Sequence, residues 1–300
     1  MDHAFVLVDV FTDRPFGGNQ LAVFTDARGL SPRAMQALAR ELNFAESTFV
    51  LPPDDPASAA RVRIFTPRAE LPFAGHPTVG TAAVLAEAGR VAWDGDVAAF
   101  TLEEGIGSVQ VAVRRRGALL SGELTLDQPV VLPAVAPDRT HVAAALSLEA
   151  TAVKDAWFAG IGVRFCFVHV ASAEAVDRAV LDRAAWASGL AGGWSPQVFF
   201  FAGDTTAGSE LHARMFAPAF GIEEDPATGS AAAILIASLA ARGDRRDASL
   251  ALRIRQGVVM GRASTIEARA EKRDGIVQRV HVGGDVTFSG RGTMHVPEGY

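Results

Sequence analysis

The chain has 300 residues, of which 49% are hydrophobic and 21% charged, and its formal net charge is −6. This composition argues against a disordered chain, and the length accommodates two domains with ordinary cores. The mildly acidic balance, with no basic run interleaved with aromatic residues, argues against a nucleic-acid partner.

Strand-like and helix-like segments alternate through the first half. Residues 5–10 and 21–24 predict strands on either side of a turn cluster. Ser31 followed by proline predicts a helix start, and Asn43 suits its end. Further strands are predicted over 47–51, 61–65, 97–102, 108–113 and 119–126, and an alanine-rich helix over 78–89.

Three prolines between residues 129 and 137 mark the predicted domain boundary. Beyond it we predict short helices within 136–146 and over 182–190, strands within 155–170 and over 198–201, 211–216, 258–268 and 277–282, and a second alanine-rich helix opening at Asp225. Residues 286–296 are strand-like and can return to the first half. The predicted domains are therefore 1–128, with 286–300 as a candidate completing strand, and 129–285.

Two segments of the first half recur in the second. Residues 63–67 are echoed by 214–218, and residues 76–83 by 225–232, at offsets of 151 and 149 residues. Such offsets are too long for a solenoid repeat and indicate two similar domains. Each half combines short strands with one helix that is apolar on all sides and must be surrounded. We predict an α+β fold in which each half wraps a curled, mostly antiparallel sheet around a central helix.

His76 and Asp225 occupy matching places in the two copies, each directly before a proline, which predicts both at a helix start. Aspartate caps helices well, so a purely structural role stays open for Asp225, whereas histidine is not a favoured cap. A helix start disfavours imidazolium and offers an anion site for a substrate carboxylate. The expected donors are the backbone amides around Gly75 and Gly229, with the Ser230 hydroxyl nearby.

Glu46 lies between a predicted helix end and a strand, among apolar neighbours. A loop glutamate is usually just solvated, but partial burial in a cleft would raise its pKa towards that of a general base. Other catalytic templates match poorly, because the chain has no phosphate loop with a lysine and no nucleophile elbow. The single cysteine, Cys166, fits a buried strand, and no cluster has metal-ligand spacing, so no metal is expected.

The N-terminus enters a strand-like segment directly, and the longest apolar stretch, residues 230–241, is shorter than a bilayer span. We therefore expect a cytoplasmic protein without a membrane partner.

Several long motifs in chain order resemble the PhzF-like proteins, a family named for the phenazine-biosynthesis isomerase. They are residues 8–11, 16–19, 44–50, 63–67, 70–77, 224–231, 256–257 and 260–262. The resemblance implies a diaminopimelate-epimerase-like fold of two pseudo-symmetric lobes with the active site in the cleft. The epimerase uses two cysteines at its helix starts, which this chain lacks, so thiol-based racemisation is not expected.

By motif, the catalytic residues that the resemblance implies are Glu46, His76 and Asp225. Ser230 is implied as a supporting substrate contact, and Asn19, in the second motif, is a further candidate for substrate binding. The phenazine enzyme isomerises dihydro-3-hydroxyanthranilate without a cofactor, by moving a hydrogen between ring carbons, and family members are often homodimers. We therefore expect a cofactor-independent isomerase of a small carboxylate-bearing substrate, and a homodimer.

Two alternatives remain open on the sequence. The same residues suit an epimerase or dehydratase of an amino or hydroxy acid. A small-acid-binding protein that kept the fold and lost turnover is a third reading, although all three candidate catalytic residues are present.

Overall fold

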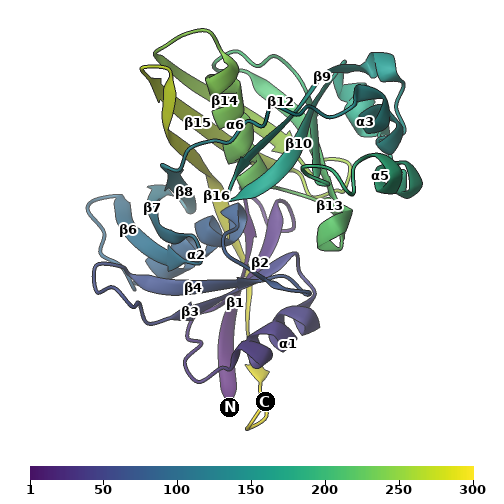
Figure 1. Ribbon diagram of the computed structural model, residues 1–300. Helices are drawn as coiled ribbons and strands as arrows, with labels where there is room; N and C mark the ends of the chain where they lie inside the picture. The colour runs from purple at the N-terminus through teal and green to yellow at the C-terminus, as the bar shows by residue number, and fades with distance from the viewer. The chain divides into compact units, whose positions relative to one another are not determined.

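The computed structural model describes all 300 residues, and the chain divides into two units (Figure 1). The first consists of Met1–Leu126 and Gly283–Tyr300, and the second of Asp127–Val282. We predicted a boundary after residue 128 and a returning segment from residue 286. The returning segment belongs to the first unit because it pairs with the N-terminal strand, and the two chain ends lie side by side in Figure 1.

The first unit is a mostly antiparallel sheet around one helix. Its strands are β1 (Asp2–Val10), β2 (Asn19–Phe24), β3 (Glu46–Leu51), β4 (Ala60–Phe65), β5 (Glu70–Leu71), β6 (Val97–Glu104), β7 (Gly107–Arg116) and β8 (Leu119–Leu126), with helices α1 (Pro32–Leu42) and α2 (Gly75–Glu87). The strands follow the order β1-β2-β3-β4-β6-β7-β8, and β16 (Ile276–His295) neighbours β8 and also pairs with β1. The sheet of this unit therefore closes on itself.

The second unit repeats this construction. Its strands are β9 (Val153–Ile161), β10 (Val163–Val170), β11 (Val198–Ala202), β12 (Glu210–Ala217), β13 (Ile222–Asp225), β14 (Ala248–Gln256) and β15 (Ser264–Arg273). Its helices are α3 (Arg139–Ala145), α4 (Ala173–Arg178), α5 (Arg183–Gly189) and α6 (Gly229–Arg242), with 3₁₀ turns η1 (Ala150–Ala152) and η2 (Pro218–Phe220).

The two units share one strand topology. β1 and β2 are antiparallel, β2 and β3 parallel, β3 and β4 antiparallel, and β4 and β6 parallel. The pairs β9–β10, β10–β11, β11–β12 and β12–β14 follow the same sequence of directions. The internal repeat noticed in the sequence thus corresponds to a repeat of supersecondary structure, with α2 and α6 at equivalent points of the chain.

Each central helix is enclosed by the strands of its own unit. The α2 helix contacts β1, β2, β3, β7 and β8, and its residues 75–86 are all buried. The α6 helix contacts β9, β10, β14 and β15. The sequence prediction of an α+β fold with a sheet wrapped around an apolar helix is confirmed in each unit.

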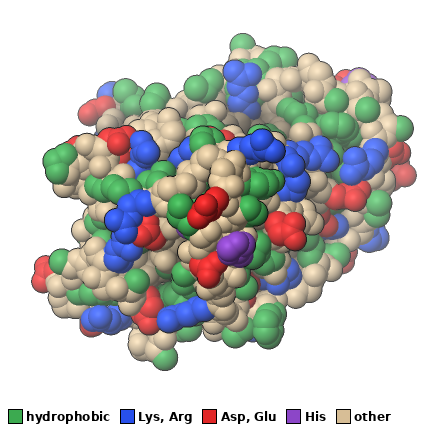
Figure 2. All heavy atoms as spheres, turned by 90° about the horizontal axis from the view of Figure 1, so that it is seen from below, with side chains coloured by type: hydrophobic (Ala, Val, Ile, Leu, Met, Phe, Trp, Pro, Cys, Tyr) green, Lys and Arg blue, Asp and Glu red, His purple; other side chains and the backbone are tan.

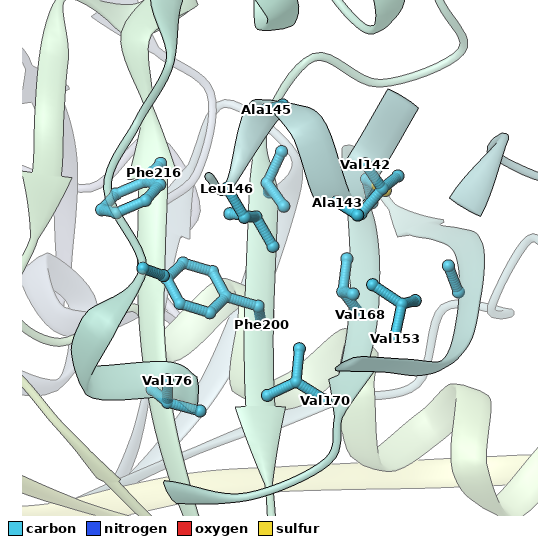
Figure 3. Close-up of a cluster of buried hydrophobic side chains, with 14 of the residues drawn as sticks. Val142, Ala143, Ala145, Leu146, Val153, Val168, Val170, Val176, Phe200 and Phe216 are labelled. Atoms are coloured by element: carbon cyan, nitrogen blue, oxygen red, sulfur yellow. The ribbon is translucent and has the colours of Figure 1, made fainter. Parts of the chain in front are cut away.

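Of the remaining helices, α1, α3 and α4 pack against strands of their own unit, and α5 packs against α3. In the first unit α1 packs Met35 and Leu38 against Phe24 and Phe49. In the second, Figure 3 shows Val142 of α3 and its C-cap residue Leu146 above the β10 and β11 side chains Val168 and Phe200. The α1 helix is amphipathic, whereas the central helices α2 and α6 are mainly apolar on all sides.

Several predicted boundaries were wrong, and the strands predicted over 277–282 and 286–296 form one strand, β16. The α2 helix starts at Gly75 and not at Thr78, because proline at the third helical position needs no hydrogen-bonded N–H. The α6 helix starts at Gly229, while Asp225 ends β13. β15 starts at Ser264, since residues 257–262 form a turn closed by a bond from the Arg262 N–H to the Gly257 carbonyl.

No helix combines the length and the apolar character that crossing a bilayer requires. On the face drawn in Figure 2, acidic and basic side chains are interspersed, as on an ordinary solvated surface.

Gly80 sets how closely α2 approaches β1 and β2. A Cβ at this position would lie 2.6 Å from Leu21 Cδ2 and 2.8 Å from Val10 Cγ2. We expect Gly80→Ala to lower the free energy of unfolding by about 1–3 kcal/mol through overpacking. Chemical denaturation measures this, with Gly192→Ala as the control because a Cβ at Gly192 meets nothing within 4 Å. Equal stabilities of the two variants would contradict the close approach.

Candidate active site

Glu46 is the first residue of β3, and its side chain is 13% exposed. Alternate residues of a strand share one face, so Glu46 and Thr48 point to the same side, towards α2. The Thr48 and Thr81 hydroxyl oxygens are 2.8 Å apart, in a buried bond between β3 and α2. This bond fixes the strand against the helix, and Glu46 lies at the helix start.

His76 is the second residue of α2 and lies beside Glu46. Its Nε2 is 3.5 Å from Glu46 Oε2, which is within the range of an ion pair. Burial nevertheless lowers the pKa of His76 to about 3, only partly opposed by a hydrogen bond to the Gln20 backbone. The imidazole is therefore neutral at ordinary pH, and the contact is not an ion pair.

The tautomer of His76 follows from its hydrogen bonds. Nε2 has no hydrogen-bond partner, so the bond to the Gln20 carbonyl is donated by Nδ1. Nε2 then presents a lone pair towards the Glu46 carboxyl group. Two acceptor atoms at this distance can bond only if one proton lies between them. The pair can therefore accept one proton on Glu46 and hold it by a hydrogen bond to Nε2.

The start of α2 has no capping side chain. Its N-cap residue, Ala74, has no side chain that could accept, and the N–H groups of Gly75 and His76 have no carbonyl within the helix to bond. The start of α6 is similar, since Thr228 makes no side-chain cap bond. By contrast, α1, α3, α4 and α5 are each capped by a serine or aspartate side chain. Uncapped starts of buried helices suit an anion such as a carboxylate.

Asn19, the fourth candidate in the first unit, is the buried first residue of β2. It pairs with Val10 and directly precedes Gln20, whose backbone binds His76. Gly18 before it has φ +55°, and a Cβ there would lie 2.2 Å from the Val10 carbonyl oxygen. Only glycine fits this turn, which sets the position of Asn19.

Asp225 ends β13 and is buried. Its Oδ2 accepts a 2.5 Å hydrogen bond from the Thr228 hydroxyl. Gly229 and Ser230 are the first two residues of α6; Gly229 is buried and Ser230 half-buried. The predicted residues of the second unit thus lie on one short segment of the chain, from the end of β13 to the first turn of α6.

Gln256 holds that segment in place, a role that the sequence analysis did not assign. Its side-chain amide donates to the Asp225 carbonyl at 2.7 Å and to the Thr228 hydroxyl at 3.0 Å, and its oxygen accepts from the Thr228 N–H. Ser264 adds a bond to the Pro226 carbonyl. A signal was present in the sequence, because Gln256 precedes Gly257 in one of the motifs of the resemblance.

Neither His76 nor Asp225 is an N-cap, so that prediction was wrong. His76 lies inside the first turn of α2, while Asp225 precedes the first residue of α6 by four positions. The loop between Asp225 and α6 is bound by Gln256 and Ser264, and those bonds replace the helical turn that Pro226 favours. Within the first unit the structure brings Glu46 and His76 together, while the predicted joint action of Glu46, His76 and Asp225 on one substrate stays a prediction.

The chain brings together no group of three or more histidine, cysteine, aspartate or glutamate side chains that could hold a metal ion. Cys166 is buried in β10, and burial raises the pKa of its thiol, which makes it unreactive.

Comparison with known proteins places this geometry in context. The family model described as phenazine biosynthesis-like protein, PhzC-PhzF, matches residues 8–292. An uncharacterised isomerase of Mesorhizobium japonicum is 38% identical over 97% of this chain and 98% of its own length. The trans-2,3-dihydro-3-hydroxyanthranilate isomerase of Pseudomonas fluorescens is also 38% identical, over 97% of this chain and 99% of its own.

Solved structures agree with the fold. A Bacillus anthracis protein of the PhzF family matches with a TM-score of 0.84 at 20% identity, covering 99% of this chain and 100% of that one. A predicted epimerase of Pseudomonas aeruginosa matches with a TM-score of 0.77 at 31% identity, covering 98% and 100%. A probable proline racemase of Agrobacterium radiobacter shares the fold, with a TM-score of 0.66 at 16% identity over 99% and 93%. The predicted diaminopimelate-epimerase-like fold is confirmed.

The neutral state of His76 has a measurable consequence. Because its pKa in the folded protein is about 3, below the ordinary value of 6.5, the ring signals in a heteronuclear NMR spectrum should stay constant between about pH 5 and about pH 7. The free energy of unfolding also depends on His76. Because the unfolded state binds the proton more tightly than the folded state, the fold becomes less stable as pH falls from 6.5 towards 3. A His76 titration centred near 6.5 would contradict the assignment, and His76→Asn identifies the signals.

Proposed function

Because the chain belongs to the PhzC-PhzF family of phenazine biosynthesis-like proteins, we propose that this isomerase moves a proton on a small carboxylate-bearing substrate of the dihydro-hydroxyanthranilate type. The observation that carries the proposal is the buried contact between the Glu46 carboxyl group and a neutral His76 at an uncapped helix start. These groups suit general acid–base catalysis next to an anion-binding position.

Glu46 takes the proton from one carbon and returns it to another. As a carboxylate it is the base, and after the transfer it is a carboxylic acid that donates a hydrogen bond to His76 Nε2. Because imidazolium is strongly disfavoured at this buried position, the proton stays on Glu46 between removal and return. The Glu46 side chain is 13% exposed, so its proton can exchange with solvent before it is returned to the substrate.

The uncapped helix starts supply the binding part of the proposal. A substrate carboxylate would accept hydrogen bonds from N–H groups at the start of α2, around Gly75, and Asn19 would bind a polar group of the same molecule. We further propose that Asp225, Gly229 and Ser230 act on this substrate, as the family resemblance implies. All atoms that move are protons, so the reaction as proposed needs no cofactor and is redox-neutral.

An epimerase is the second candidate. It is favoured by the solved structure of the predicted epimerase at 31% identity, which spans 98% of this chain. Epimerisation returns the proton to the same carbon on the opposite face and therefore needs a second acid–base group there. Analysis of the product distinguishes the two reactions, because only the isomerase changes the position of the double bonds.

Glu46→Gln tests the proton transfer. The amide keeps the size of the side chain but cannot take a proton, so we expect kcat to fall by about 10²–10⁴-fold. The assay follows trans-2,3-dihydro-3-hydroxyanthranilate in heavy water, where the wild type should place deuterium in the product and the variant should not. Glu87→Gln, at the exposed end of α2, is the control. Undiminished turnover in Glu46→Gln would remove Glu46 from the mechanism.

Asp225→Asn tests whether the second unit takes part in the reaction. The amide oxygen can still accept the Thr228 hydroxyl bond, so the segment before α6 should keep its conformation and its melting temperature. If Asp225 handles a proton of the substrate, kcat should fall by about 10²-fold or more. Activity equal to that of the wild type, at equal stability, would leave Asp225 with a structural role only.

A further inference from the structure

Glu104 is a buried carboxyl group that the proposed mechanism does not use. It is the last residue of β6, is 8% exposed, and makes no ion pair. Its Oε1 is 2.6 Å from the Thr78 hydroxyl oxygen, and its Oε2 has no hydrogen-bond partner. A buried carboxylate ordinarily needs several donors or a cation, and Glu104 has at most one donor.

The number of hydrogen atoms available for the contacts of Glu104 and Thr78 determines the protonation state of Glu104. The Thr78 hydroxyl has one hydrogen, but it lies 2.6 Å from Glu104 Oε1 and 2.8 Å from the Ala74 carbonyl oxygen. If Glu104 is ionised, its carboxylate and the Ala74 carbonyl can both only accept a hydrogen bond. The single hydrogen of Thr78 then leaves one of the two contacts without a hydrogen bond. With a protonated Glu104 the carboxyl donates to Thr78, and Thr78 donates to Ala74. Only the neutral acid makes both bonds.

The charged groups of the surrounding elements do not alter this conclusion. On α2 the nearest titratable residue along the chain is His76, which is neutral, and Glu87 lies at the opposite end of the helix. On β7 the residue opposite Glu104 is Gly107, the first residue of the strand. The charged residues of β7 lie at its other end. The charged residues of β4, Arg61 and Arg63, pair with Asp54 and Glu70.

The same conclusion follows from burial. Glu103, the neighbour of Glu104 on β6, points to the opposite face and accepts from the backbone N–H groups of Asp54 and Asp55. No charged group acts on Glu104, so burial raises its pKa to about 8, against a smaller opposing effect of the Thr78 bond.

Glu104 bonds to the part of the chain that places His76. Ala74 is the N-cap of α2, two residues before His76. The next residues after Glu104 hold the same loop, since the Ile106 N–H donates to the Pro72 carbonyl and a Cβ on Gly105 would lie 2.7 Å from Pro72 Cα. The turn between β6 and β7 therefore holds the loop before α2 at Pro72 and, through Thr78, at Ala74.

We propose that Glu104 is a positioning residue: a carboxylic acid that stays protonated at neutral pH and, through Thr78 and Ala74, holds His76 in place for proton transfer. The protonation of Glu104 stands independently of the reaction. Its effect on turnover rests on the proposed function.

Thermal unfolding against pH tests the protonation without a substrate. The amide of Glu104→Gln can donate to Thr78 as the acid does, but it never ionises. The pKa of Glu104 is raised from its ordinary value of 4.5 to about 8. Its burial therefore destabilises the wild type least below pH 4.5, and the wild type loses stability as pH rises to about 8. The melting temperature of Glu104→Gln relative to wild type should therefore rise over this range and then level off.

Glu103→Gln is the matched control, because it makes the same change one residue away on the other face of β6. Its melting temperature relative to wild type, recorded over the same pH range, gives the effect of replacing a partly exposed carboxylate on this strand. A difference for Glu104→Gln that does not vary with pH, or that varies as in Glu103→Gln, overturns the assignment of Glu104 as a neutral acid.

The positioning role has two further readouts. In the wild type the His76 ring signals should shift with a midpoint near pH 8, and this shift should be absent from Glu104→Gln. An unchanged His76 signal through that midpoint overturns the link between Glu104 and His76, even where no substrate turns over. With turnover, kcat of the wild type should decline through the same midpoint while KM is unchanged, and Glu104→Gln should lack the decline.

Thr78→Val removes the hydroxyl between the two groups while keeping the shape of the side chain. We expect a loss in kcat on the order of 10²-fold, as for a displaced catalytic group. Wild-type protein that turns over no candidate acid would contradict the proposed function, yet the unfolding curves and the His76 signals would still decide the role of Glu104.

Discussion

The burial of one apolar helix inside each sheet is the constraint on which the rest of this structure depends. A helix that is apolar on every side must be surrounded, and both α2 and α6 are enclosed by the strands of their own unit. Enclosure removes the helix starts from solvent while leaving their first N–H groups without capping side chains. The same packing that stabilises each unit thus creates a polar, partly positive position in an apolar setting.

Burial also determines the chemistry of the titratable groups near the start of α2. It keeps His76 neutral, so that the ring donates to the Gln20 carbonyl and leaves a lone pair directed at Glu46. It raises the pKa of Glu104, which lies against the same helix. The roles proposed for Glu46 and Glu104 differ because their partners differ: Glu46 lies beside an acceptor nitrogen, while Glu104 lies beside a hydroxyl already bonded to the backbone.

The repeat of the fold does not extend to the details of the two helix starts. The units share the order and directions of their strands, yet α2 begins one residue before His76 and α6 begins four residues after Asp225. In the second unit Gln256 and Ser264 bind the backbone around Pro226 and hold an extended segment where the first unit has a helical turn. The two halves therefore carry an imidazole and a carboxylate at corresponding places in the sequence, on backbone segments of different conformation.

Local patterns in the sequence determined the elements, their repetition and the residue types at the helix starts. The serine cap and left-handed Asn43 of α1, the apolar central helices and the returning C-terminal strand were all readable, because each depends on neighbours along the chain or on periodicity. The family motifs supplied Glu46, His76 and Asp225 as candidate catalytic residues. Only the tertiary structure decided the tautomer and charge of His76, the hold of Gln256 on Asp225 and the protonation of Glu104. Those properties depend on burial and on hydrogen bonds between residues tens of positions apart, which no local pattern encodes.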